Sequence, residues 1–330
     1  MGSEFLIPQS ENRRVRSVLL TCLKVLVSGF LVWFLLNRIG IENIGRTIAR
    51  ANAAWLLGGV LLFAASHILG SAQWQMLLYA EGIFIPYRKC LSIYFVGSFF
   101  NNFLVGHIGG DVFRIYDVRR ISKRGTAAVS AVFLDRFVGL LTMSGIAVAS
   151  IPFAFSGKAF GSFLWICFAV LISGWCFSLL FLFRKPFARR FAWIIPFLLP
   201  RRIETKAREV YNRVHRFGEE KALLCRVVLL STVVQAARIF THYLLARALG
   251  IGIGPAVYFL VIPIVAMAAS LPISLGGIGL REQTGALLLG AAGVAAAQAV
   301  SVEFLAYLTA IFTSLPGGAV FVLRKMGKGR

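Results

Sequence analysis

Long apolar runs recur along the whole chain, and they constrain its fold more than any other feature. A helix needs about 20 apolar residues to cross a bilayer. Six stretches have this length and almost no internal charge: Ser17–Ile39, Trp55–Leu78, Thr126–Phe155, Gly161–Phe183, Leu223–Leu249 and Phe304–Leu323. Backbone groups in lipid must be hydrogen-bonded within the protein, which favours helices. The sequence therefore predicts an all-α, polytopic membrane protein with about six full spans.

Composition and charge support a membrane protein and argue against a nucleic-acid-binding one. The chain is 58% hydrophobic and 15% charged, whereas soluble domains are about 45–50% apolar and about 25% charged. A net charge of +22 would suggest nucleic acid in a soluble chain. Here the basic residues mostly flank apolar runs, as they do on the cytoplasmic side of membrane proteins. Anionic lipid is the expected partner.

The distribution of basic residues predicts the orientation of the chain. Positive clusters near the two ends place both termini in the cytoplasm, with residues 1–16 as a cytoplasmic tail and 187–222 as a second cytoplasmic, basic segment. The loops at 156–161 and 250–256 are nearly uncharged and are expected outside. The arginines at 38, 46 and 50 count against this scheme, because they fall in an outside loop. The predicted location is the bacterial cytoplasmic (inner) membrane.

Two stretches fit neither a full span nor a loop. Residues 87–124 surround "HIGGDVFR", and residues 255–302 surround "LPISLGGIGLRE". In each stretch, an apolar segment is followed by a glycine pair and then by charged residues. Both termini lie inside only if each stretch enters and leaves the membrane on one side, the first from the cytoplasm and the second from outside. This predicts two re-entrant helical hairpins within one transmembrane domain spanning 1–330, a layout that an inverted repeat would produce.

The first glycine pair is followed by charges that share a helix face. Gly109 and Gly110 permit a sharp turn, and Asp111 is placed to cap a new helix. Asp111, Arg114 and Asp117 recur every three residues and therefore lie on one side of that helix. Two interpretations stay open: a turn followed by a cytoplasmic helix, or a re-entrant element that lines a polar cavity.

Further charges lie deep inside apolar runs. Asp135 and Arg136 are at least nine residues from the nearest preceding charge, nearly halfway across the hydrocarbon. Each charge costs about 2.5–3.5 kcal/mol at that depth. A structural salt bridge explains them as well as a functional site does. Arg238 is also mid-span and forms a polar stripe with Gln235 and His242.

The second hairpin and the last predicted span contribute charges as well. Arg281 and Glu282 directly follow "GGIG", and Glu303 opens the last span with Tyr307 one turn later. Interior charge thus comes from at least four separated segments. A shared cavity would give these charges partners, and its arginines and helix N-termini would attract an anion. We expect a phosphate-bearing lipid headgroup.

The two glycine-containing stretches resemble the signatures of a known family. "NNFLVGHIGGDVFRIYDVRR" with "AAVSAVFLDRFVGLL" is similar to the first signature of the lysylphosphatidylglycerol-synthase transmembrane-region family, and "LPISLGGIGLRE" to the second. The resemblance covers nearly the whole chain. It implies a fold with two re-entrant helices and a function like that of the flippase half of multiple-peptide-resistance factors, which moves aminoacylated phosphatidylglycerol between leaflets. Other members are stand-alone proteins of lipid or polyprenyl-glycan pathways.

Residues from the resemblance and from the chain's own pattern make up the predicted substrate site. The predicted substrate-binding residues are Asn102, Gly109, Gly110, Asp111, Arg114, Asp135, Arg136, Arg238, Gly276, Gly277, Arg281 and Glu282. No aminoacyl-transferase domain is expected, so the substrate need not be lysyl-lipid. No catalytic residue, metal site or cofactor is predicted, and the five cysteines form no CxxC pair.

Three functions remain open at this point. The leading hypothesis is a flippase for an anionic phospholipid or a polyprenyl-phosphate-type lipid. The alternatives are a membrane-embedded lipid-modifying transferase, and an assembly partner of such an enzyme in an envelope lipid or glycan pathway. A homodimer and a lipid-modifying enzyme are the protein partners considered, and no nucleic acid is expected.

Overall fold

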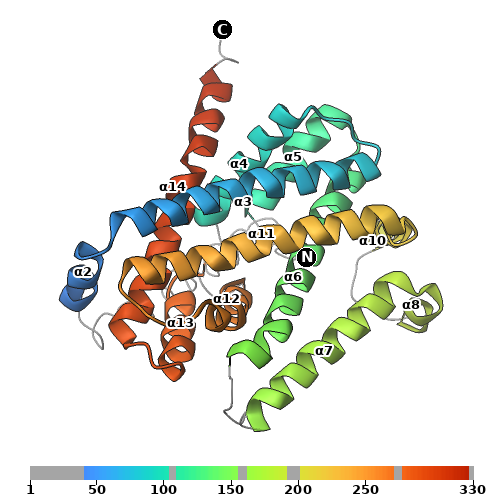
Figure 1. Ribbon diagram of the computed structural model, residues 1–330. Helices are drawn as coiled ribbons and strands as arrows, with labels where there is room; N and C mark the ends of the chain where they lie inside the picture. The colour runs from blue at the N-terminus through green and yellow to red at the C-terminus, as the bar shows by residue number, and fades with distance from the viewer. Residues whose placement is uncertain (1–40, 104–108, 155–161, 192–200, 271–276, 327–330) are drawn as a thin grey trace, which may run out of the picture.

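The described part of the chain is helical throughout. A computed structural model describes residues 41–103, 109–154, 162–191, 201–270 and 277–326, in which the regular structure is α-helix without a strand (Figure 1). The helices are α2 (Ile41–Ala49), α3 (Ala53–Ala80), α4 (Tyr87–Phe103), α5 (Gly109–Ser122), α6 (Gly125–Ala154), α7 (Ser162–Phe183), α8 (Lys185–Phe191), α10 (Arg201–Phe217), α11 (Lys221–Ala248), α12 (Pro255–Ser270), α13 (Leu280–Ala291) and α14 (Ala296–Met326). The all-α prediction is confirmed.

Four of the described helices are long and apolar enough to cross a membrane. They are α3, α6, α11 and α14, and they coincide with four of the predicted runs. The predicted run at 161–183 forms the 22-residue helix α7, which lies to one side of the bundle with α8 (Figure 1). The predicted span at 17–39 and the tail at 1–16 lie outside the described residues. Helix α14 begins at residue 296, earlier than the predicted run, so Glu303 lies two turns inside it.

The two irregular stretches form helical hairpins. Helices α4 and α5 have 17 and 14 residues and pack side by side. Helices α12 and α13 have 16 and 12 residues and also pack together. Each helix is shorter than the roughly 20 residues needed to cross a bilayer. The connecting residues 104–108 and 271–276 lie outside the described residues. Hairpin geometry at both predicted positions is what a re-entrant element requires.

The same order of elements occurs twice. A long helix, a hairpin and a second long helix form α3, α4–α5 and α6, and again α11, α12–α13 and α14. Helices α3 and α11 lie side by side and run in opposite directions (Figure 1). The first helix of each hairpin packs on the closing helix of the other half, α4 on α14 and α12 on α6. Such reciprocal packing is what an inverted repeat would produce.

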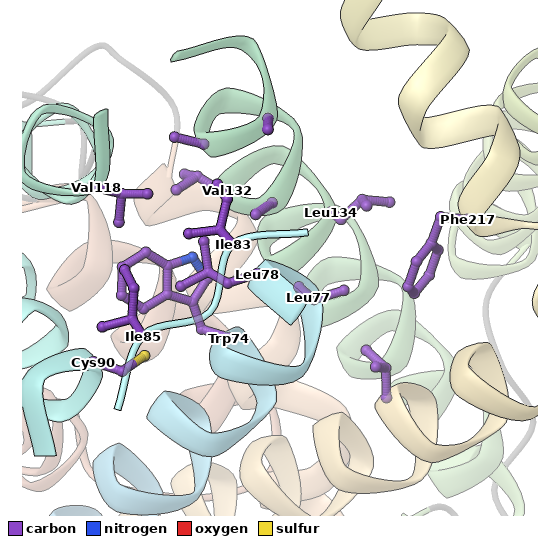
Figure 2. Packing of buried hydrophobic residues seen from close by; sticks show 14 of the residues in the cluster. Trp74, Leu77, Leu78, Ile83, Ile85, Cys90, Val118, Val132, Leu134 and Phe217 are labelled. Carbon is purple, nitrogen blue, oxygen red and sulfur yellow. The ribbon is translucent and has the colours of Figure 1, made fainter. Parts of the chain in front are cut away.

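The core of the first half surrounds a buried tryptophan. Trp74 of α3 lies among Ile83, Ile85 and Val118 (Figure 2), and all four side chains are almost fully buried. Helices α3, α4, α5, α6 and α10 all contribute to this cluster. Cys90 is part of it, as expected for a cysteine that acts as a small apolar residue. The cluster fixes the α4–α5 hairpin against α3 and α6.

Helix α10 is joined to the bundle by charged side chains. Arg213 donates at 3.0 Å to buried Glu81, the residue that ends α3, and Ser130 of α6 donates to the same carboxylate at 2.6 Å. Thr126 donates to Glu209 at 2.6 Å. The hydrogen bonds from Thr126 and Arg213 lower the pKa of Glu209. This helix lies in the segment predicted to be cytoplasmic and basic, and its charged side chains attach it to α6 and to the end of α3.

Candidate functional site

Helices α5 and α6 bring four of the predicted charged residues together. Arg114 of α5 donates to Asp135 of α6 at 2.8 Å and lies 3.4 Å from Asp111. Arg136 of α6 donates to the two oxygens of Asp111 at 2.8 and 3.1 Å. Gln73 of α3 donates to the second oxygen of Asp135 at 3.1 Å. We call Asp111, Arg114, Asp135 and Arg136 the first charge cluster.

The first charge cluster is electrically balanced and largely buried. Its two arginines face two carboxylates. The Arg114 side chain is 4% exposed, and its guanidinium lies 4.1 Å from the ring centroid of Trp74 and 4.8 Å from that of Tyr94. Cation–π contacts of this kind stabilise a desolvated arginine. Arg136 differs, because 45% of its side chain is exposed. The cluster therefore ties α5 to α6 and presents only Arg136 to its surroundings.

The start of α5 is held by an asparagine and by close backbone contact. The amide nitrogen of Gly110 donates to the Asn101 side chain at 2.9 Å. The expectation that Asp111 caps this helix is wrong, because α5 begins at Gly109 and Asp111 lies inside its first turn. Its carboxylate is engaged by Arg136 and Arg114. Gly110 also lies against the Gly97 carbonyl of α4, so closely that a Cβ would overlap that oxygen. The glycine is needed for helix packing.

Arg238 of α11 adjoins the first charge cluster through Tyr94. It donates to the Tyr94 hydroxyl at 3.1 Å and to Ser66 at 3.4 Å, and Tyr94 in turn packs under Arg114. Within the described residues, Arg238 has no carboxylate at ion-pair distance. Its positive charge is therefore balanced by hydroxyl dipoles alone, although it lies in the middle of a helix long enough to span a membrane.

A second group of charges lies between α11, α13 and α14. Glu303 of α14 is 0% exposed, and its carboxylate lies 3.9 Å from His242 Nε2 of α11. Arg281 of α13 is close enough to interact electrostatically with both residues, and its guanidinium lies 5.7 Å from the centroid of the Tyr307 ring. We call Glu303, His242 and Arg281 the second charge cluster.

The remaining predicted site residues have positions that suggest structural roles. Asn102 donates to the Ala310 carbonyl at 3.1 Å and to Ser314 at 2.9 Å, which joins α4 to α14. Gly109 is the first residue of α5. Gly277 has a φ of +77° and lies against Ala269. Glu282 accepts a hydrogen bond from the Gly279 amide at 2.6 Å at the start of α13. Gly276 lies outside the described residues.

Two aromatic residues that contact the first charge cluster were not predicted from the sequence. Trp74 and Tyr94 contact Arg114, but both lie in apolar runs where an aromatic residue usually indicates core packing. The pattern of polar residues could have pointed to Asn101, which lies in the last turn of α4 and precedes the glycine pair. Only proximity in the fold identifies the aromatic pair.

A pocket lies beside the helices that hold the first charge cluster, not at the cluster itself. Its volume is about 710 Å³, and its walls are mostly apolar side chains of α5, α6, α7 and α10. Arg119, Lys123 and Lys206 add positive charge to its lining. We call it the basic groove. The cavity predicted to be lined by Arg114, Arg136, Arg238 and Arg281 stays a prediction.

Comparison with known proteins agrees with the resemblance seen in the sequence. The family model described as "Lysylphosphatidylglycerol synthase TM region" matches residues 21–317. A UPF0104 membrane protein of Pyrococcus horikoshii is 25% identical over 327 residues, which cover 92% of this chain and 96% of the relative. The family match thus includes both hairpins, all of α3, α6 and α11, and most of α14.

Proposed function

The chain belongs to the lysylphosphatidylglycerol synthase TM region family, and from that membership and its buried charges we propose that it moves a phosphate-bearing lipid headgroup between membrane leaflets. It is a membrane protein with several apolar helices. The proposed cargo is an anionic phospholipid or a polyprenyl-phosphate-type lipid, whose tails remain in the bilayer while the headgroup crosses through the protein.

Arg238 is the observation that carries this proposal. A mid-span arginine is costly, and such residues usually pair with a carboxylate or face a polar pathway. Arg114 and Arg136 are neutralised by Asp111 and Asp135, whereas Arg238 contacts only hydroxyls among the described residues. A phosphate can accept hydrogen bonds from a guanidinium in place of those hydroxyls, and Arg is well suited to that geometry. Arg238 thus has positive charge to offer an anionic headgroup.

The basic groove is a suitable place for lipid to enter. Its apolar walls include Val129, Phe133 and Val210, which match acyl chains. Lys123 and Lys206 in its lining match a negative headgroup, since basic residues near the cytoplasmic leaflet attract anionic lipid. The groove adjoins α5 and α6, the helices that hold the first charge cluster. A headgroup bound there would lie beside the hairpin that leads into the membrane.

Replacing Arg238 with glutamine is expected to slow lipid transfer by about tenfold or more. A hydrogen bond to a charged group contributes about 1.5–3 kcal/mol, and glutamine cannot supply the charge. The measurement is leaflet exchange of a fluorescent anionic lipid in proteoliposomes. Arg247→Gln is the matched control, because Arg247 lies on the same helix, is exposed, and stacks near Trp55 at 5.8 Å. Equal transfer rates for the two variants would remove Arg238 from the transport site.

We further propose a cytoplasmic-membrane location with both termini inside, as the basic clusters indicate. In a cysteine-free background, Thr205→Cys in α10 is expected to react with a membrane-impermeant maleimide only from the cytoplasmic side. Gly254→Cys, between α11 and α12, is expected to react only from the outside. Both positions are exposed. Labelling of both from the same side would contradict the proposed orientation of α11.

A further inference from the structure

Glu303 is a buried carboxylate without a hydrogen bond to any described residue. The side chain is 0% exposed, and within the described part of the chain neither oxygen has a hydrogen-bond partner. His242 Nε2 lies 3.9 Å from Oε2. Gly285 of α13 lies directly opposite, where a Cβ would come within 2.6 Å of Glu303 Cγ. An ionised carboxylate without partners in such surroundings is costly, far more so than a neutral acid.

The hydrogen bonding of His242 determines what faces Glu303. His242 Nδ1 lies 3.0 Å from the Arg238 carbonyl oxygen. A carbonyl oxygen can only accept, so Nδ1 carries the hydrogen. In a neutral ring Nε2 then presents a lone pair, and this lone pair points toward a carboxylate that also has only lone pairs. A single proton, on the carboxyl oxygen or on Nε2, removes this mismatch.

Other titratable groups around Glu303 come from two helices, α12 and α13. Arg281 and Glu282 of α13 interact with it electrostatically, and so does Tyr258 of α12. The Tyr258 hydroxyl is also buried without a hydrogen-bond partner among the described residues. Glu282 is engaged by the Gly279 amide. Helices α2, α3 and α4 also pack on α14, but within the described residues none of their titratable groups is in contact with Glu303.

The repeat places a matching trio in each half. In the first half, Gln73 of α3, Asp135 of α6 and Arg114 of α5 are hydrogen-bonded together. In the second half, the corresponding helices α11, α14 and α13 carry His242, Glu303 and Arg281. The first acid is fully paired, with Arg114 at 2.8 Å. The second acid has no hydrogen bond within the described residues, and the helix that corresponds to α3 brings a titratable histidine to it in place of a glutamine.

We propose that Glu303 and His242 form a proton-binding site, and that the uptake and release of one proton there couples lipid movement to the proton gradient. In the loaded state the Glu303 carboxyl and the His242 ring are both neutral. Release sends the proton to water on the other side of the membrane and leaves a carboxylate whose charge Arg281 balances. The proton site stands on geometry alone, whereas the coupling rests on the proposed lipid transport.

Infrared difference spectroscopy tests the proton site without any lipid assay. Spectra of the purified protein are recorded in mildly acidic and in mildly alkaline buffer. Their difference is expected to contain the C=O stretch of a buried carboxylic acid. This band should be absent in Glu303→Gln and retained in Glu204→Gln, a control at a surface ion pair of α10. His242→Gln should change the pH at which the band appears. A band that persists in Glu303→Gln, or no band in the unmodified protein, overturns the proton site.

A second measurement separates coupling from transport. In proteoliposomes, a pH gradient is expected to change the rate of lipid transfer by the unmodified protein and to leave the rate of Glu303→Gln unaltered. If the infrared band is present but the unmodified protein transfers no lipid, the proposed function fails and the proton site stands. If the unmodified protein transfers lipid at a rate that does not depend on the pH gradient, the proposed coupling is overturned.

Discussion

Gly110→Ala is expected to separate α4 from α5 and to reduce the yield of folded protein severely. The new Cβ would overlap the carbonyl oxygen of Gly97 and lie 2.7 Å from the Asn101 side chain that holds the helix start. Alanine favours a helix over glycine by about 1 kcal/mol, but the overlap is with backbone and no rotamer change relieves it. Overpacking of a tight contact costs about 1–3 kcal/mol, occasionally more.

The measurement is the fraction of monodisperse protein on size-exclusion chromatography in detergent, together with its thermal midpoint. Gly145→Ala is the matched control, since Gly145 is in the middle of α6 and a Cβ there meets nothing within 4 Å. Its yield and midpoint should equal or exceed those of the unmodified protein. Indistinguishable behaviour of the two variants would show that α4 and α5 do not approach as closely as described.

Arg114→Met is expected to destabilise the protein by about 3–5 kcal/mol, the usual cost of breaking a buried ion pair. The substitution leaves Asp135 buried with Gln73 as its only described hydrogen-bond partner. The double variant Arg114→Met/Asp135→Leu removes both charges and should recover most of the loss, because neither partner remains unpaired. The measurement is unfolding by denaturant, followed by tryptophan fluorescence.

Two results would contradict this expectation. If the double variant is less stable than Arg114→Met alone, Asp135 has a stabilising partner other than Arg114. If Arg114→Met is as stable as the unmodified protein, the arginine is not buried between Trp74 and Asp135. In either case the double variant also tells whether the pair is needed for lipid transfer, since its fold should be intact.

Patterns along the chain were sufficient to predict the helices and the hairpins. Apolar runs predicted α3, α6, α11 and α14, and the glycine pairs followed by charge predicted two helical hairpins. These features depend on local composition and length, which a sequence displays directly. The doubling of the arrangement was also visible, since the two glycine-containing stretches have similar order.

The pairing of charges could not be predicted from the same patterns. Arg114, Asp135 and Arg238 all appear as isolated intramembrane charges in the sequence. Their different roles depend on which helices meet: Arg114 reaches Asp135 because α5 packs on α6, whereas Arg238 reaches only hydroxyls of α3 and α4. Glu303 likewise looked like the polar start of a span, and only the packing of α13 and α11 buries it.

The exchange of partners between the two halves has a consequence for biogenesis. Helix α4 completes its packing only on α14, where Asn102 bonds to Ala310 and Ser314 more than 200 residues later in the chain. Gly317 is likewise pressed against the backbone of Phe95. The N-terminal part of the chain leaves the ribosome first. The packing of its first hairpin therefore stays incomplete until the last helix has been synthesised. Neither half can mature alone, and membrane insertion must precede final assembly.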